Sequence, residues 1–143
     1  MSLPNVNITL GNGNIGAVTL SDDGIAGLIL TGTAVSSTLE LNKVYVIAST
    51  SDLKKLGLTA ENNPLAYKEV LGFYESAGDG AELHLLVVDA AKTLTEICSM
   101  EDGSPLKTLI DSAAGRIRLV GINRNPEDAY EPTVTSGIDQ DVV

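Results

Sequence analysis

The stretch that most constrains the fold of this chain runs from Asn63 to Asp89, and its pattern predicts a helix, a tight turn and a strand. Asn63 suits the N-cap and Pro64 the first helical position. Two adjoining rows of apolar residues then recur at helical spacing: Ala66, Val70, Phe73 and Ala77, beside Tyr67, Leu71 and Tyr74. Gly78 can end the helix, and Leu83 to Val88 is almost wholly aliphatic, like a strand covered on both faces. We therefore expect a helix that lies on a sheet.

Further strands and helices are expected on both sides of this stretch. Strands are predicted over Gly24 to Leu30, Lys43 to Ala48 and Arg116 to Ile122. Ser49 with Asp52 resembles a capping box at the start of a short helix. Two more helices are predicted, from Thr93 to Met100 and from a Ser104 cap to Gly115. Strands joined through helices are expected to be parallel, so the predicted class is α/β, a layered and mostly parallel sheet flanked by helices.

The chain divides into three predicted parts: an extended N-terminal arm over 1–20, an α/β core over 21–122, and a linker with the start of a truncated C-terminal region over 123–143. Val6, Ile8 and Leu10 alternate with polar residues, which is strand spacing. Such a strand must pair with a sheet in its own subunit or in another. Ser136 to Val143 is interpreted as the opening of a further helix, and the chain as a piece of a longer protein.

Composition excludes several classes of function. The formal net charge is -10 and aromatic residues make up 3%, so neither contact with a nucleic-acid phosphate backbone nor base stacking is expected, and no nucleic-acid partner is predicted. No apolar run approaches the ~20 residues of a membrane helix, and no secretory leader is visible, so membrane insertion is not predicted. Cys98, the single cysteine, is expected to be a small buried residue on a short helix.

Two patterns could carry chemistry, and each has a simpler explanation. Gly11 to Gly16 matches the dinucleotide-binding G-x-G-x-x-G pattern, but a poor helix follows it and the second strand does not end in an acidic residue, which favours a flexible turn. His84 is the only histidine and shares a strand face with Glu82. An acid/base role is possible in principle, but without a nucleophile or metal partner a structural role is favoured.

Charged residues at strand ends give further candidates. Asp89 ends a strand where α/β proteins bind ligands, although a capping role is commoner. Arg116 and Arg118, expected opposite Ile117 and Leu119 on the last strand, could contact an anionic partner at an interface or pair with acidic residues of the same chain. The remaining carboxylate pairs are interpreted as solvated turns and helix starts: Asp22 with Asp23, Glu101 with Asp102, and Asp139 with Asp141. No catalytic residue, metal site or cofactor is predicted, and the protein is not expected to be an enzyme.

Three segments resemble contractile phage tail sheath proteins of the Bacteroidetes phage or prophage type. They are LAYKEVLGFYESAGDGAELHLLVV at 65–88, Tyr45 to Gly57, and Leu3 to Leu10 with Asp23 to Leu30. The resemblance covers roughly residues 3 to 122 as an N-terminal fragment, and it is a diffuse pattern without a catalytic fingerprint.

The resemblance implies a virion structural protein, present in the bacterial cytoplasm during assembly. Its subunits would polymerise around an inner tube and contract to drive the tube through a target envelope. The partners it implies are other copies of the chain and, through a C-terminal part absent here, a tail tube protein. In the family, terminal arms add strands to neighbouring subunits, a role that falls here on Val6, Ile8 and Leu10. Related secretion-system and extracellular injection sheaths share the fold.

A second hypothesis remains open beside the sheath. It is a nucleotide- or small-molecule-binding α/β protein that uses Gly11 to Gly16, or the strand ends near Ser49 and Asp89.

Overall fold

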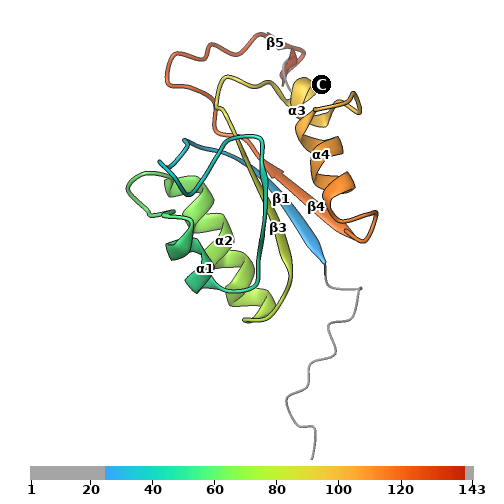
Figure 1. Ribbon diagram of the computed structural model, residues 1–143. Coiled ribbons are helices and arrows are strands. Elements are labelled where there is room, and N and C mark those ends of the chain that lie inside the picture. Colours follow the sequence, from blue (N-terminus) through green and yellow to red (C-terminus); the bar gives the residue numbers. More distant parts are fainter. Residues whose placement is uncertain (1–24, 141–143) are drawn as a thin grey trace, which may run out of the picture.

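The computed structural model describes residues 25–140, in which one sheet lies between two layers of helices (Figure 1). In chain order the elements are β1 (Ala26–Thr31), β2 (Val44–Ile47), α1 (Thr50–Lys55), α2 (Pro64–Ala77), β3 (Leu83–Val88), α3 (Leu94–Cys98), α4 (Pro105–Ser112), β4 (Leu119–Asn123), β5 (Val134–Thr135) and β6 (Ile138–Asp139). Among the described residues, no helix combines the length and the apolar character needed to cross a bilayer.

Within the described residues, the main sheet has four strands in the order β2-β3-β1-β4. β1 is central and runs parallel to both β3 and β4, while β2 runs antiparallel to β3 at one edge. The predicted α/β class, with a mostly parallel sheet flanked by helices, is therefore confirmed. β5 and β6 form a separate two-stranded hairpin.

The antiparallel direction of β2 corrects the expectation that strands joined through helices are all parallel. Both α1 and α2 connect β2 to β3. α2 begins beside the carboxyl end of β1, where Asn63 contacts Thr33, and it ends near the carboxyl end of β2, where Gly80 N–H donates to the Ala48 carbonyl at 2.8 Å. After β2, α1 and the following loop lead the chain back to the end of the sheet at which β2 began, and α2 then returns it to the end at which β2 finished. β3 therefore starts beside the end of β2 and runs antiparallel to it.

α2 and β3 confirm the predicted centre of the fold. The buried stripe of α2 is Ala66, Val70 and Tyr74, and all six residues of β3 are buried. Asn63 is the N-cap residue, but its side chain makes no capping bond. Its amide instead joins the loop after β1: Oδ1 accepts from Thr33 N–H at 2.7 Å and Nδ2 donates to the Thr33 carbonyl at 3.1 Å. The N-cap residue thus links the start of α2 to the loop after β1.

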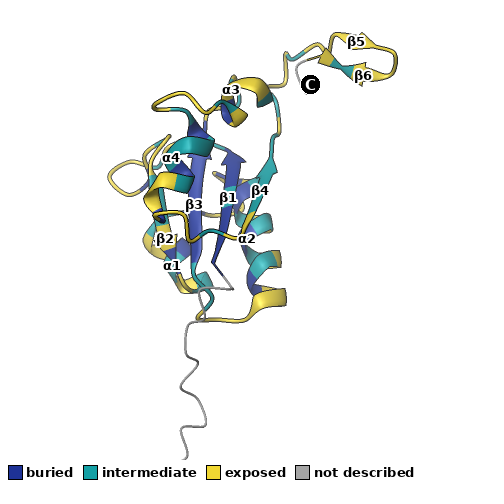
Figure 2. Cartoon of the chain, turned by 90° about the vertical axis from the view of Figure 1, so that its right-hand side faces the viewer, coloured by how far each residue is buried: buried dark blue, intermediate teal, exposed yellow. Residues whose placement is uncertain are grey.

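The sheet separates two hydrophobic clusters, and Figure 2 shows the buried strands between helices with exposed outer faces. The larger cluster joins the sheet to α1 and α2 and includes Leu30, Leu53, Ala66, Val70, Leu83 and Leu85. The smaller joins the other face to α3 and α4 and consists of Ile29, Leu86, Val88, Ile97 and Leu109. β3 contributes to both clusters because successive strand residues point to opposite faces.

Three local predictions are wrong in detail. The last strand begins at Leu119 rather than Arg116, and Leu119 is 69% exposed. Cys98 is exposed, because the five-residue helix α3 turns only Ile97 into the core. Ser49 is the N-cap of α1 but makes no side-chain capping bond to it. Asp52 instead accepts from the backbone N–H of Ala48, the residue before the cap, at 3.0 Å.

The predicted helix over Ser136 to Val143 is also wrong within the part that the structure describes. Ser136 and Gly137 have φ of 55° and 83° and link β5 to β6. Two consecutive residues with positive φ make the tight hairpin turn that suits the twist of paired strands. A hairpin therefore replaces the expected helix up to Gln140, and Figure 2 shows that it projects away from the main sheet.

Candidate functional site

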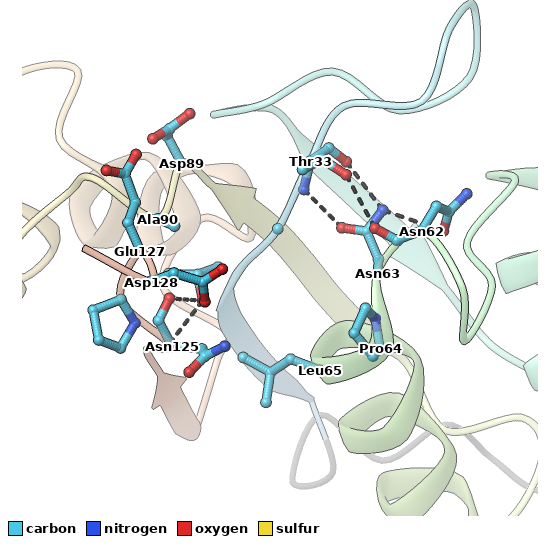
Figure 3. Close-up of a pocket in the computed structure, with 13 residues that line it drawn as sticks. Thr33, Asn62, Asn63, Pro64, Leu65, Asp89, Ala90, Asn125, Glu127 and Asp128 are labelled. Carbon is cyan, nitrogen blue, oxygen red and sulfur yellow. Dashed lines mark hydrogen bonds between the residues drawn. The ribbon is translucent and has the colours of Figure 1, made fainter. Parts of the chain in front are cut away.

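An open groove of about 460 Å³ lies at the carboxyl ends of β1 and β3, the position at which α/β proteins bind ligands (Figure 3). The loops after β1, β3 and β4 and the start of α2 form its walls. Its lining residues are Thr31, Gly32, Thr33, Asn62, Asn63, Pro64, Leu65, Asp89, Ala90, Asn125, Pro126, Glu127 and Asp128.

Hydrogen bonds across the groove hold its walls together. Thr31 Oγ1 donates to the Asn125 carbonyl at 3.1 Å and accepts from Asn125 N–H at 2.8 Å. On the other side of the groove, the Asn63 side-chain amide forms hydrogen bonds with the backbone N–H and carbonyl of Thr33. These polar groups are therefore engaged with the protein itself.

The charge of the groove disfavours a phosphate ligand. Its lining includes the carboxylates of Asp89, Glu127 and Asp128 and, among the described residues, no lysine or arginine. Asp89 Oδ1 accepts from Ala91 N–H at 2.9 Å, so it stabilises a turn and caps no helix. Across residues 25–140, no three His, Cys, Asp or Glu side chains gather closely enough to hold a metal ion. The start of α2 would attract an anion, but the carboxylates around it would repel one.

Ser49 and Asp89 lie at opposite ends of the sheet, which corrects the expectation that they share a ligand-binding edge. Ser49 follows β2 and Asp89 follows β3, and these two strands are antiparallel. Of the two strand ends predicted to bind a small molecule, only the one at Asp89 therefore lies at the groove. Gly11 to Gly16 lies outside the described residues.

His84 is 2% exposed and joins three parts of the fold. Its Nε2 lies 2.8 Å from Glu82 Oε1 and its Nδ1 lies 3.1 Å from Ser112 Oγ at the end of α4. The side chains have the types of a Ser-His-acid triad, but Ser112 donates its hydroxyl to the Leu109 carbonyl at 2.6 Å. A buried ring with hydrogen-bonding partners at both nitrogens fits the structural role favoured for His84. The sequence did not reveal Ser112, because it is 28 positions away.

All three arginines of the sequence flank the edge strand β4. Arg116 Nη2 lies 3.5 Å from Glu82 Oε1, and Arg118 is exposed. Beyond the strand, Arg124 Nε donates to the Lys92 carbonyl at 2.8 Å, and its guanidinium carbon lies 4.8 Å from the Tyr130 ring centre. The start of β4 is therefore basic in a strongly acidic chain. The predicted arm residues Val6, Ile8 and Leu10 lie outside the described residues.

Both edge strands of the main sheet carry a large exposed apolar side chain. Val46 on β2 is 59% exposed, and Leu119 on β4 is 69% exposed. An edge strand presents unpaired backbone groups, and apolar side chains beside them favour pairing with another chain. The two edges are therefore the strongest candidates for an interaction surface.

Comparison with known proteins places the chain in one family. The model of the DUF2586 N-terminal domain matches residues 3–131, which include the whole of the four-stranded sheet. No curated protein and no solved structure matches the chain.

Proposed function

We propose that this chain, which belongs to the DUF2586 family through its N-terminal domain, is a structural subunit of a contractile tail sheath. Sheath subunits would polymerise around an inner tube and contract to drive it through a target envelope. The observation that carries the proposal is a small α/β domain whose two edge strands each expose a large apolar side chain, Val46 and Leu119. A domain with two such edges is suited to assembly.

The charge and packing of the described residues agree with a role in assembly. The groove at the carboxyl ends of β1 and β3 is acidic, and its polar walls bond to one another. His84 is buried in a hydrogen-bonded link. The lining of the groove includes no lysine or arginine to bind a phosphate, and the Ser112 hydroxyl beside His84 donates to the Leu109 carbonyl. We therefore propose a protein without a catalytic function.

The proposed partners follow from the same hypothesis. Other copies of the chain would bind through the N-terminal arm, in which Val6, Ile8 and Leu10 would add a strand to a neighbouring subunit. A tail tube protein would bind through a C-terminal part of the sheath subunit. The location would be the virion tail, or the corresponding sheath of a secretion or injection system, after assembly in the bacterial cytoplasm.

A small-molecule-binding protein is the second candidate, and the groove beside Asp89 is the observation that favours it. Its position at the carboxyl ends of parallel strands is the usual one for α/β ligands. A ligand of this groove would be neutral or cationic, because the ionisable groups that line it are carboxylates.

Deletion of residues 1–20 tests the sheath proposal against a nucleotide-binding role of the arm. For a sheath subunit, the shortened chain keeps its circular dichroism spectrum and melting temperature but no longer assembles. A matched pair of full-length variants makes the test specific: Val6, Ile8 and Leu10 replaced by Asn should also abolish assembly, whereas Asn5, Asn7 and Thr9 replaced by Ser should not. If the deletion unfolds the core and removes a thermal shift produced by NAD or ATP, the arm is a nucleotide loop and the sheath proposal fails.

A further inference from the structure

We propose that neighbouring copies of this chain join edge to edge, with β4 of one copy pairing antiparallel to β2 of the next. The inference rests on the proposed self-assembly and names a contact within it. β2 and β4 are the two edges of the main sheet. Because β2 runs antiparallel to β3 and β4 runs parallel to it through β1, a second copy placed in the same orientation presents its β2 antiparallel to β4.

The helical layers do not cover the edge strands completely, and each edge strand exposes one large apolar side chain. Val46 pairs with His84 and so points to the face on which Leu86 packs with α4, yet Val46 is 59% exposed. Leu119 pairs with Ala26 and so points to the α1 and α2 face, yet it is 69% exposed. The uncovered apolar side chains therefore lie at opposite edges and on opposite faces. Parallel sheets are normally covered on both faces, so these two uncovered side chains leave room for a neighbour.

The register of the strands shows what continuation of the sheet would bring together. Ile47, Leu83, Ala26 and Leu119 form one row across the four strands, and Val46, His84, Gly27 and Val120 form the adjacent row. Extending the first row places Leu119 against Ile47 of the next copy, on one face. Extending the second places Val120 against Val46 of the next copy, on the other face. Each exposed apolar side chain gains an apolar cross-strand partner.

Charge at the end of the strands supports the same pairing. Arg118 directly precedes Leu119, and Ala48 directly follows Ile47. The Ala48 carbonyl accepts from Gly80 N–H at 2.8 Å, which holds the exposed Asp79 beside the end of β2. In the extended sheet, Arg118 of one copy would approach Asp79 of the next. The basic start of β4 thus meets an acidic turn of the neighbour, and opposite charges favour this register.

A contact of this kind is heterologous, because each copy uses β4 on one side and β2 on the other. Such contacts repeat to give rings or open helical polymers. The occupant proposed for each edge is therefore a second copy of this chain, and the surface that binds it is the opposite edge.

Charge reversal in the full chain tests the contact. Sedimentation velocity over a concentration series should show self-association of the wild type. Arg118→Glu alone and Asp79→Lys alone should each weaken it by at least about tenfold, because like charges then face each other. An equimolar mixture of the two variants should recover wild-type association, since the introduced glutamate then meets the introduced lysine, and the native Arg118 meets the native Asp79. The exposed α2 residues supply controls, Lys68→Glu and Glu75→Lys, which should change nothing.

A second pair of variants tests the apolar part of the contact. Val46→Lys and Leu119→Lys should weaken association without lowering the melting temperature, whereas Met100→Lys, at an exposed apolar residue away from both edges, should not. A wild type that stays monomeric at every concentration, or edge variants that associate like the wild type, would overturn the contact. If association were lost only on removal of residues 1–20, the N-terminal arm of a neighbouring copy, and not its edge strand, would be the part that binds the sheet edge. If the edge variants still formed sheath-like tubes, the β4–β2 contact would be ruled out, whereas the proposed function would be unaffected.

Discussion

At the scale of single residues, Asp52 shows how a polar side chain joins a strand to a helix. Its Oδ1 accepts from Lys55 Nζ at 2.7 Å, and its Oδ2 accepts from Ala48 N–H at 3.0 Å. The Lys55 contact and then the Ala48 contact lower the pKa of the Asp52 carboxyl to about 2 from its ordinary value of 3.8. The ionised carboxylate therefore fixes the turn from β2 into α1.

The pKa of Asp52 predicts an acid-dependent loss of stability. A carboxyl whose pKa is lower in the folded state stabilises the fold above its unfolded pKa, and this contribution is lost as pH falls through the folded value. Asp52→Asn should therefore lower the free energy of unfolding at pH 7, and the difference from wild type should shrink between pH 3.8 and about 2. Urea titrations at several pH values measure the difference. Glu61→Gln, at an exposed carboxylate, should differ little from wild type throughout. A gap for Asp52→Asn that stays constant down to pH 2 would contradict this role.

At the scale of elements, burial separates two strand leucines that look alike in the sequence. Leu86 on β3 is fully buried, whereas Leu119 on β4 is 69% exposed. The difference follows from position in the sheet, because β3 is covered by helices on both faces and β4 lies at an edge.

Truncation of these two leucines should therefore have very different costs. Leu86→Ala should lower the free energy of unfolding by about 2–5 kcal/mol, since it opens a cavity in a packed core. Leu119→Ala should change it by no more than about 0.5 kcal/mol, as an exposed substitution does. Chemical denaturation of the monomeric chain at low concentration measures both values. Equal losses would contradict the assigned edge position of β4.

The elements set by local patterns could be predicted, and those set by distant contacts could not. α2 and β3 follow from apolar spacing and from Gly78, so the sequence alone indicates them. The direction of β2 depends on how α1 and α2 pack together. The exposure of Leu119 depends on which strand lies at the edge of the sheet. No local sequence pattern indicates either of them. The hairpin at Ser136 escapes prediction because a short apolar pattern obscures the Ser-Gly turn signal.

The candidate site divides in the same way. Arg116 and Arg118 could be named as surface charges from their alternation, although nothing local placed them beside a bare sheet edge. The exposure of Val46 at the opposite edge could not be predicted from the sequence, because its strand has the same β-branched composition as a buried strand. The grouping of Ser49 with Asp89 is wrong, since it assumes parallel strands.

At the scale of the whole molecule, the two edge strands of the sheet, β2 and β4, are the feature with the most consequence. Each edge exposes one large apolar side chain, and the two point to opposite faces of the sheet. One edge also has a basic strand start, and an acidic turn lies beside the other. In the proposed contact, each edge of one copy binds the opposite edge of the next. Self-assembly, proposed here as a contractile sheath, would cover both edges with copies of one chain.

Negative-stain electron microscopy of the protein, expressed alone and concentrated, tests the proposed sheath most directly. The predicted result is tubes or stacked rings, built from one kind of subunit. Uniform small particles at every concentration would contradict a self-assembling sheath subunit, and a ligand screen of the groove beside Asp89 would then take its place.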